Sequence, residues 1–191
     1  MLSMDKTQIW RRNECAVFHK VKAQFGEFGN MAGGFHLQVP TLGGGYMLVT
    51  SSEALYQALG FPHLPLIQKA ILTANGGFAA KLVMKPHKEQ RRPDWEEVKV
   101  PIMRWCLQLK LAQYRWKLAA AIASAGDRPL VELSMKDNFW GAIPLDGFSL
   151  RGANMLGRLW MEVIAAADAP FTPPPITDLR LLDIPLTEVS P

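Results

Sequence analysis

The chain has 191 residues, of which 49% are hydrophobic and 20% charged, a balance that excludes wholesale disorder and suits one domain with a full core. Its two cysteines, Cys15 and Cys106, lie far apart without a CxxC spacing, which argues against a disulfide framework and a cysteine-ligated zinc site. The formal net charge is +4, and about ten Lys or Arg face four Asp or Glu between Lys81 and Lys117. This surface would attract a polyanion, although a solvated helix face explains the same charges.

The distribution of apolar residues predicts a cytoplasmic protein. The N-terminal residues carry charges with no apolar run behind them, unlike a secretory signal peptide. No segment approaches the roughly 18 continuous apolar residues of a membrane span. We therefore expect no membrane partner.

The first part of the chain predicts short strands followed by helices. Apolar and alternating runs predict strands at residues 15–18, 35–39 and 46–49. The last two strands are expected to pair as a hairpin across the Gly43–Gly45 turn. Ser52 is predicted to cap a first helix, and apolar residues at helical spacing from Leu66 to Ile71 predict a second one.

The second part predicts longer helices and one strand. A helix begins at Asp94, and Pro101 inside its pattern predicts a kink or a restart. Further elements are expected at residues 116–125 (a helix closed by Gly126), 130–133 (a strand) and 151–167 (a helix). The fold class is therefore α+β, a helix-rich single domain with a small sheet over residues 1–169. The proline-rich residues 170–191 form an extended arm, whose leucines suggest packing on this domain or on a second subunit.

Several motifs resemble those of the NADAR family of YbiA-like proteins and follow one another in the same order as in that family. They are Phe25–Ala32 (FGEFGNMA), Thr50–Ala58 (TSSEALYQA), Asp94–Lys99 (DWEEVK), Lys136–Gly141 (KDNFWG) and Asn154–Glu162 (NMLGRLWME). The resemblance covers residues 12–165 or so and implies a YbiA-like fold, N-glycosidase activity and no cofactor.

Two other stretches, Glu14–Phe18 and Ile102–Leu107, resemble the family branch that partners DarT-type toxins, which ADP-ribosylate guanine in DNA. This resemblance implies an antitoxin-like enzyme that removes ADP-ribose from guanine in DNA or a nucleotide, with a cognate toxin as partner. The chain departs from its relatives at Gly60, where many carry Lys or Arg, and in its Gly43–Gly45 insertion. Two alternatives stay open: an N-glycosidase of riboflavin-pathway intermediates, and a non-catalytic module that binds ADP-ribose or a nucleotide.

The chemistry of N-glycosidic cleavage points to three catalytic candidates. Positive charge builds on the ribose C1 carbon, and the leaving base must take up a proton, so a carboxylate and an acid are needed. Glu53, at a helix start, is the candidate carboxylate, although it could simply be a capping residue. Asp137 is a second acid or a ribose ligand, or else a turn-forming residue. The resemblance also suggests a lysine that forms a Schiff base with the opened ribose, with Lys20 as first choice; any one such lysine could equally be a surface residue.

The candidate binding residues combine aromatic rings with a glycine-rich loop. Trp140, beside Gly141, and Trp95 could stack on a base, although both also suit a hydrophobic core. The full set that the resemblance implies is Phe28, Gly29, Asn30, Met31, Tyr56, Gln57, Lys81, Lys85, Trp95, Trp140, Gly141 and Asn154. Lys81 and Lys85 are also the alternatives to Lys20. The four histidines show neither HxH nor HxxxH spacing, so no metal site is expected.

Overall fold

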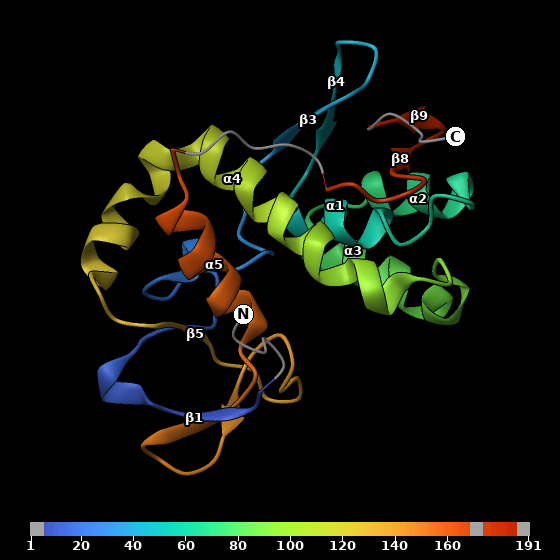
Figure 1. Ribbon diagram of the computed structural model, residues 1–191. Helices are drawn as coiled ribbons and strands as arrows, with labels where there is room; N and C mark the ends of the chain where they lie inside the picture. Colours follow the sequence, from blue (N-terminus) through green and yellow to red (C-terminus); the bar gives the residue numbers. More distant parts are fainter. Residues whose placement is uncertain (1–5, 169–173, 187–191) are drawn as a thin grey trace. The chain divides into compact units, whose positions relative to one another are not determined.

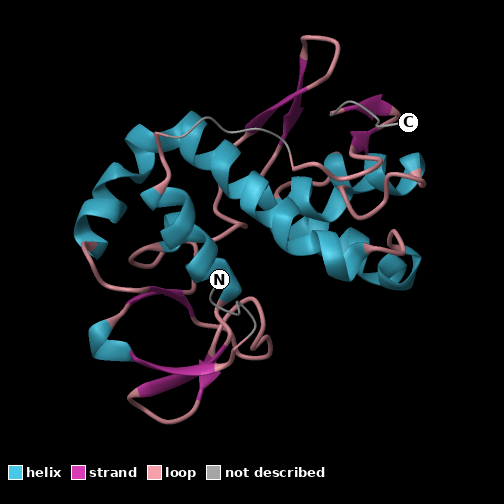
Figure 2. Ribbon diagram, viewed as in Figure 1, coloured by secondary structure: helices cyan, strands magenta, loops and turns pink. Residues whose placement is uncertain are grey.

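The computed structural model (Figure 1) describes residues 6–168 and 174–186. These residues form two compact units. The first unit comprises residues 6–29 and 114–167, and the second comprises residues 30–113, 168 and 174–186. Both units mix helices with short strands (Figure 2), which confirms the α+β class. Among the described residues, no helix has the length and apolar character needed to cross a membrane.

The first unit contains a three-stranded antiparallel sheet in the order β1–β7–β6 and a parallel pair, β2 with β5. The elements are β1 (Gln8–Arg11), η1 (Arg12–Glu14), β2 (Ala16–Phe18), η2 (Gly26–Phe28), β5 (Leu130–Glu132), β6 (Ile143–Pro144), β7 (Ser149–Gly152) and α5 (Met155–Ala165). The last turns of the long helix α4 (Trp95–Ala125), from Tyr114 onward, also belong to this unit.

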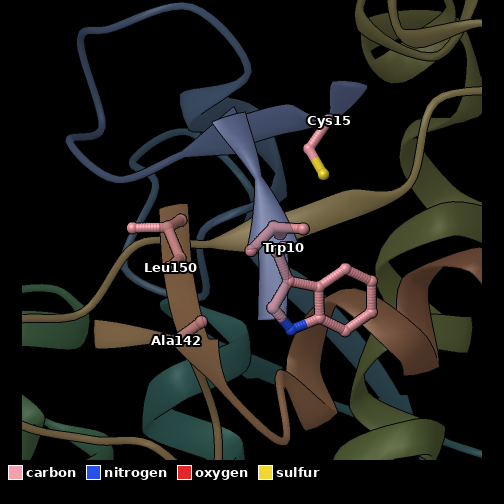
Figure 3. Close-up of a cluster of buried hydrophobic side chains, with 5 residues drawn as sticks. Trp10, Cys15, Ala142 and Leu150 are labelled. Carbon is pink, nitrogen blue, oxygen red and sulfur yellow. The ribbon is translucent and has the colours of Figure 1, made fainter. Parts of the chain in front are cut away.

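Two clusters of buried side chains, each with a tryptophan, stabilise the first unit. Figure 3 shows Trp10, Cys15, Ala142 and Leu150 in one of them, and the Trp10 indole donates to the carbonyl of Gly152 at 3.1 Å. In the other, Trp160 meets Phe28 edge to face at 5.3 Å and donates to its carbonyl at 2.7 Å. Both indole N–H groups are thus paired, which removes the cost of burying them unsatisfied.

The second unit packs short helices against a hairpin. Its elements are β3 (Leu37–Pro40), β4 (Tyr46–Val49), α1 (Ser52–Ala58), α2 (Pro65–Leu72), α3 (Gly77–Met84), η3 (Lys85–Gln90), the first part of α4, β8 (Arg180–Leu181) and β9 (Ile184–Pro185). β3 and β4 pair antiparallel, as the sequence predicts. All seven residues of α1 are buried, so the polar side chains on this helix need partners within the protein.

The described part of the C-terminal arm, residues 174–186, packs on the second unit of its own chain. The buried Gln68 side chain of α2 donates to the carbonyl of Arg180 at 3.0 Å and accepts from the N–H of Leu182 at 2.9 Å. Arg92 donates to the carbonyl of Thr177 at 2.7 Å. The predicted boundary at residue 169 and the arm residues 170–173 and 187–191 lie outside the described residues.

Three expected boundaries are wrong. The N-cap of α1 is Ser51 rather than Ser52, because the Ser51 hydroxyl accepts from the N–H of Ala54 at 3.1 Å. Helical geometry in α4 breaks at Tyr114 (φ −129°, ψ 24°) and not at Pro101. Residues 151–154 are not helical: β7 runs to Gly152, and Asn154 is left-handed with φ 51°, so the last helix begins at Met155. The Asn154 side chain bonds the backbone of β5, which holds this turn in place.

Candidate active site

Glu53 is a buried carboxylate in the first turn of α1. Only 5% of Glu53 is exposed, and its Oε1 accepts a hydrogen bond from the Gln57 amide one turn later at 2.7 Å. The Glu53 backbone N–H donates to the carbonyl of Asn30 at 3.3 Å, which ties the helix start to the glycine-rich segment. A buried carboxylate persists only where polar groups compensate its lost hydration.

The Gln57 amide connects this carboxylate to a cation. Its Oε1 accepts from Nη2 of Arg91, which also contacts Sδ of Met84 at 3.2 Å. The guanidinium carbon of Arg91 lies 4.6 Å from the ring centroid of Trp95, whose ring lies 5.0 Å from that of Tyr56. Glu53, Gln57, Arg91, Trp95 and Tyr56 therefore form one contiguous set, which we call the Glu53 cluster.

Burial and mutual charge set the protonation of this cluster. Burial raises the pKa of Tyr56 well above its usual value, against the opposing charge of Arg91. Burial lowers the pKa of Arg91, while the charges of Tyr56 and Glu53 act to raise it. Burial raises the pKa of Cys106 on α4, and the charge of Glu53 adds to that shift. The charge of Glu53 thus acts on the pKa of three neighbours, Tyr56 on α1, Arg91 after η3 and Cys106 on α4, as expected in a water-poor site.

The first turn of α3 packs directly on the Glu53 backbone region. A Cβ placed on Gly77 would lie 3.0 Å from Glu53 Cβ, 3.0 Å from Met31 Cα and 3.0 Å from Ser51 Oγ. The preceding Gly76 has φ 88°, a left-handed conformation that glycine adopts without strain. These two glycines allow Met31, Glu53 and the N-terminus of α3 to approach one another.

Two polar atoms near this point lack a hydrogen-bond partner within the described residues. The Oδ1 atom of Asn30 is buried and unpaired, although its amide nitrogen contacts Sδ of Met103 at 3.0 Å. The Ser52 hydroxyl, next to Glu53 in α1, is also buried and unpaired. Buried polar groups are nearly always satisfied, so these two unpaired atoms, one on α1 and one in the residue whose carbonyl accepts from the Glu53 N–H, are candidates to bind a ligand.

The predicted site residues fall into two groups. The second unit brings together Glu53, Tyr56, Gln57 and Trp95 and places Asn30 and Met31 at the start of α1. Lys81 and Lys85 follow on α3 and η3 with exposed side chains.

The first unit holds the remaining predicted residues. Phe28 is fully buried against Trp160, and Gly29 closes η2. Asn154 is fully buried; it donates to the carbonyl of Leu130 at 2.9 Å and accepts from the N–H of Glu132 at 2.9 Å. Through these contacts Phe28 and Asn154 stabilise the packing of the first unit. Their role in substrate binding stays a prediction.

Asp137 and Trp140 share one turn of the first unit. Asp137 is exposed, and its Oδ1 accepts from the N–H groups of Phe139 (3.0 Å) and Trp140 (2.8 Å). The Trp140 ring is half-buried edge-on against Phe139 at 5.1 Å. Gly141 next to it is buried where a Cβ would lie 2.8 Å from the carbonyl of Glu132. Asp137 therefore orders the loop that presents Trp140.

Lys20 lies in an exposed turn of the first unit. Strand β2 ends at Phe18, two residues before this lysine. The Lys20 side chain is exposed, and its carbonyl closes the turn by accepting from the N–H of Ala23 at 2.9 Å. The burial that would activate a lysine amine is absent at this position.

The sequence did not identify Arg91 or Gly77 as site residues. Arg91 lies 34 residues from Gln57, in the run Arg91-Arg92-Pro93, where nothing in the local pattern separates a site arginine from a surface one. Gly77 belongs to a Gly-Gly pair, which predicts a turn, so the sequence pattern does not indicate that α3 begins at this residue. Within the described residues, no group of three or more His, Cys, Asp or Glu could hold a metal ion.

A separate pocket of about 570 Å³ lies in the first unit. It is lined by Arg11, Arg12, Asn13, Gly147, Phe148 and Ser149. None of the predicted site residues contributes to it.

Comparison with known proteins points to one family. The NADAR domain profile matches residues 17–166. An N-glycosidase of Nostoc punctiforme is 33% identical over 153 residues, 76% of this chain and 88% of that protein. The N-glycosidase YbiA of Escherichia coli is 29% identical over 146 residues, 76% of this chain and 84% of that protein. The solved structure of Escherichia coli YbiA aligns with a TM-score of 0.64 at 23% identity, over 85% of this chain and 95% of that one, which confirms the YbiA-like fold.

A longer relative carries a different name. A riboflavin biosynthesis protein of Vibrio vulnificus is 36% identical over 113 residues, 59% of this chain. The match spans only 29% of that protein's length.

Proposed function

This chain belongs to the NADAR domain family and is a glycosidase hydrolase, and on that premise we propose that it removes ADP-ribose from guanine, in DNA or a nucleotide, in the cytoplasm. The observation that carries the proposal is the Glu53 cluster: a buried carboxylate that accepts from Gln57, which in turn accepts from Arg91. Asn30 Oδ1 and the Ser52 hydroxyl, in the same unit, add two buried polar atoms without a partner among the described residues. A ribose offers hydroxyl groups that such acceptors bind, and its C1 carbon develops the positive charge that a carboxylate stabilises.

The reaction needs one water and no cofactor. The bond between C1 and the guanine nitrogen breaks, and its electron pair stays on the nitrogen. The water oxygen bonds to C1 while one water proton passes to Glu53, and the departing nitrogen takes up a proton. The products are ADP-ribose and guanine, and Glu53 is a carboxylate again once it passes its proton on.

Substrate choice within the family rests on two features of the chain. Glu14–Phe18 and Ile102–Leu107 resemble the branch that counters DarT-type toxins, and the basic stretch between Lys81 and Lys117 suits a polyanionic substrate. We propose a cognate toxin of this class as the partner in function. Coexpression with such a toxin should restore growth if the chain acts as its antitoxin.

One specific observation favours a second candidate function, cleavage of a riboflavin-pathway intermediate. It is the similarity to the Vibrio vulnificus relative, a riboflavin biosynthesis protein. The discriminating experiment incubates the enzyme with an ADP-ribosylated guanine oligonucleotide and, separately, with riboflavin-pathway intermediates, and measures the products by mass spectrometry. Free ADP-ribose from the oligonucleotide supports the proposal, whereas cleavage of the intermediates alone contradicts it. Tight binding of the oligonucleotide without release would instead identify a non-catalytic module.

A further inference from the structure

An exposed stripe of mixed character runs along α3 into η3. It consists of Phe78, Lys81, Leu82 and Lys85, which we call the α3 stripe. Their spacing of three, four and seven residues places them on one side of a helix. The side is solvent-facing, because Phe78 is 65% and Leu82 53% exposed and both lysines are exposed. Apolar and cationic groups therefore share one face that the described residues leave uncovered.

The segment formed by α3 and η3 contacts the Glu53 cluster at both of its ends. At its start, Gly77 abuts Glu53 and Met31, and Phe78 is the next residue. At its end, Arg91 follows η3 and bonds to Gln57. All of these residues belong to the second unit, so the stripe borders the site within one compact body.

We propose that the α3 stripe binds a single strand of nucleic acid next to the base that is cleaved, with a base stacked on Phe78 and phosphates paired with Lys81 and Lys85. The proposal rests on the proposed function for the identity of the reacting base. Stacking on an aromatic ring with lysines along the backbone is the usual mode of single-strand binding. Phe78 to Lys85 spans about 10 Å of helix, the height of about three stacked bases.

The chemistry of the α3 stripe favours a single strand of nucleic acid over other binding partners. Lys88 continues the positive charge into η3, and Glu89 is the sole acidic residue between Phe78 and Gln90. A single strand of nucleic acid exposes the faces of its bases, whereas a duplex buries them. Stacking on Phe78 should therefore make the protein bind the single strand more tightly than the duplex. A second copy of this chain would bring another basic face to the stripe and is disfavoured by charge.

The test measures fluorescence anisotropy of an unmodified, fluorescein-labelled 12-nucleotide DNA, single-stranded and as a duplex, with the full chain. Phe78→Ala should weaken single-strand binding about tenfold or more. The double variant Lys81→Glu/Lys85→Glu should weaken it further and flatten its dependence on salt, because fewer counterions are released. Matched controls are Tyr46→Ala, an aromatic that is also 65% exposed, and Lys69→Glu on α2; both should bind within about twofold of the wild type.

Several outcomes would overturn the proposal. The first is no binding by the wild type, and the second is an equal loss of binding in the control variants. The third is a loss of binding in the stripe variants that comes from unfolding alone. It would be recognised by circular dichroism of those variants together with normal binding by Leu82→Gln, a milder change. A wild-type dimer in sedimentation that Phe78→Ala converts to monomer would assign the stripe to a second copy. The unmodified DNA has no bond to cleave, so stripe-dependent binding without turnover on modified DNA would refute the proposed function alone.

Discussion

Glu53 occupies a position that argues for function over helix capping. With Ser51 as the N-cap, Glu53 is the second residue of α1, whereas a capping box places its Glu or Gln at the third. Its Oε1 instead accepts from Gln57, which in turn accepts from Arg91. The motif around Glu53 and Gln57 predicted both residues, but Arg91 depends on a contact across 34 positions that no local pattern reveals.

Trp140 should matter more for binding than for folding. Its ring is half-buried, unlike that of the fully buried Trp160. Trp140→Ala should weaken ADP-ribose affinity by about 1–3 kcal/mol, the value of one stacked base. Trp160→Ala, as the core control, should cost about 3–5 kcal/mol of unfolding free energy. Calorimetric titration and urea unfolding measure the two effects; a Trp140→Ala protein as unstable as Trp160→Ala, with normal affinity, would place Trp140 in the core.

A covalent lysine would be revealed by borohydride added during turnover. Reduction converts a Schiff base between a lysine amine and the opened ribose into a permanent bond, which peptide mapping locates. The sequence makes Lys20 the first choice for this lysine. An adduct mapped to Lys81 or Lys85 would instead place the covalent lysine on the α3 stripe. Absence of any adduct, with full activity in Lys20→Ala, would leave attack by water assisted by Glu53.

At the scale of elements, the sequence predicted segments whose periodicity is local. The β3–β4 hairpin, α2 and the start of α4 appear where the apolar pattern places them. The pattern was silent on β1, which is defined by pairing with β7 across about 140 positions, as in Trp10 with Leu150. It was also silent on β6, a strand of two residues that pairs with β7 nearby in the chain. It also mistook residues 151–154 for helix, since the left-handed Asn154 is held by contacts with β5.

The close approach of α3 to α1 should make Gly77 intolerant of a side chain. In Gly77→Ala the new Cβ would meet Glu53, Met31 and Ser51 at 3.0 Å each, so α3 must shift away from the site. We expect a loss of about 1–3 kcal/mol of unfolding free energy, typical of overpacking, together with reduced turnover. Gly43→Ala is the control, because a Cβ there meets nothing within 4 Å. Equal stability and activity in both variants, measured by urea unfolding and product release, would show that α3 does not shape the site.

For the molecule as a whole, buried acids in the second unit set the response to alkaline pH. Burial raises the pKa of Tyr56 above its unfolded value of about 10, and it also raises that of Cys106 above about 8.5. As pH rises through these unfolded values, the unfolded chain loses protons that the folded chain keeps. The stability that these neutral groups contribute is therefore complete below about pH 8.5 and declines at higher pH.

Tyr56→Phe should reduce this alkaline loss of stability. The variant lacks the phenol that ionises in the unfolded chain, so its unfolding free energy should fall less steeply above about pH 10. Urea unfolding between about pH 8 and 11 measures the slope, with the exposed Tyr46→Phe as control. Equal slopes in wild type and Tyr56→Phe would mean that Tyr56 is not held neutral by burial.

Turnover by Glu53→Gln tests the catalytic role of the buried carboxylate most directly. The measurement is the rate of free ADP-ribose release from an ADP-ribosylated guanine oligonucleotide, followed by mass spectrometry for the wild type, Glu53→Gln and the exposed control Glu97→Gln. We predict release by the wild type and Glu97→Gln, and a loss of about a hundredfold or more in Glu53→Gln with its thermal unfolding preserved. Near-normal release by a folded Glu53→Gln protein would contradict the account, because the buried carboxylate would then have no part in the chemistry.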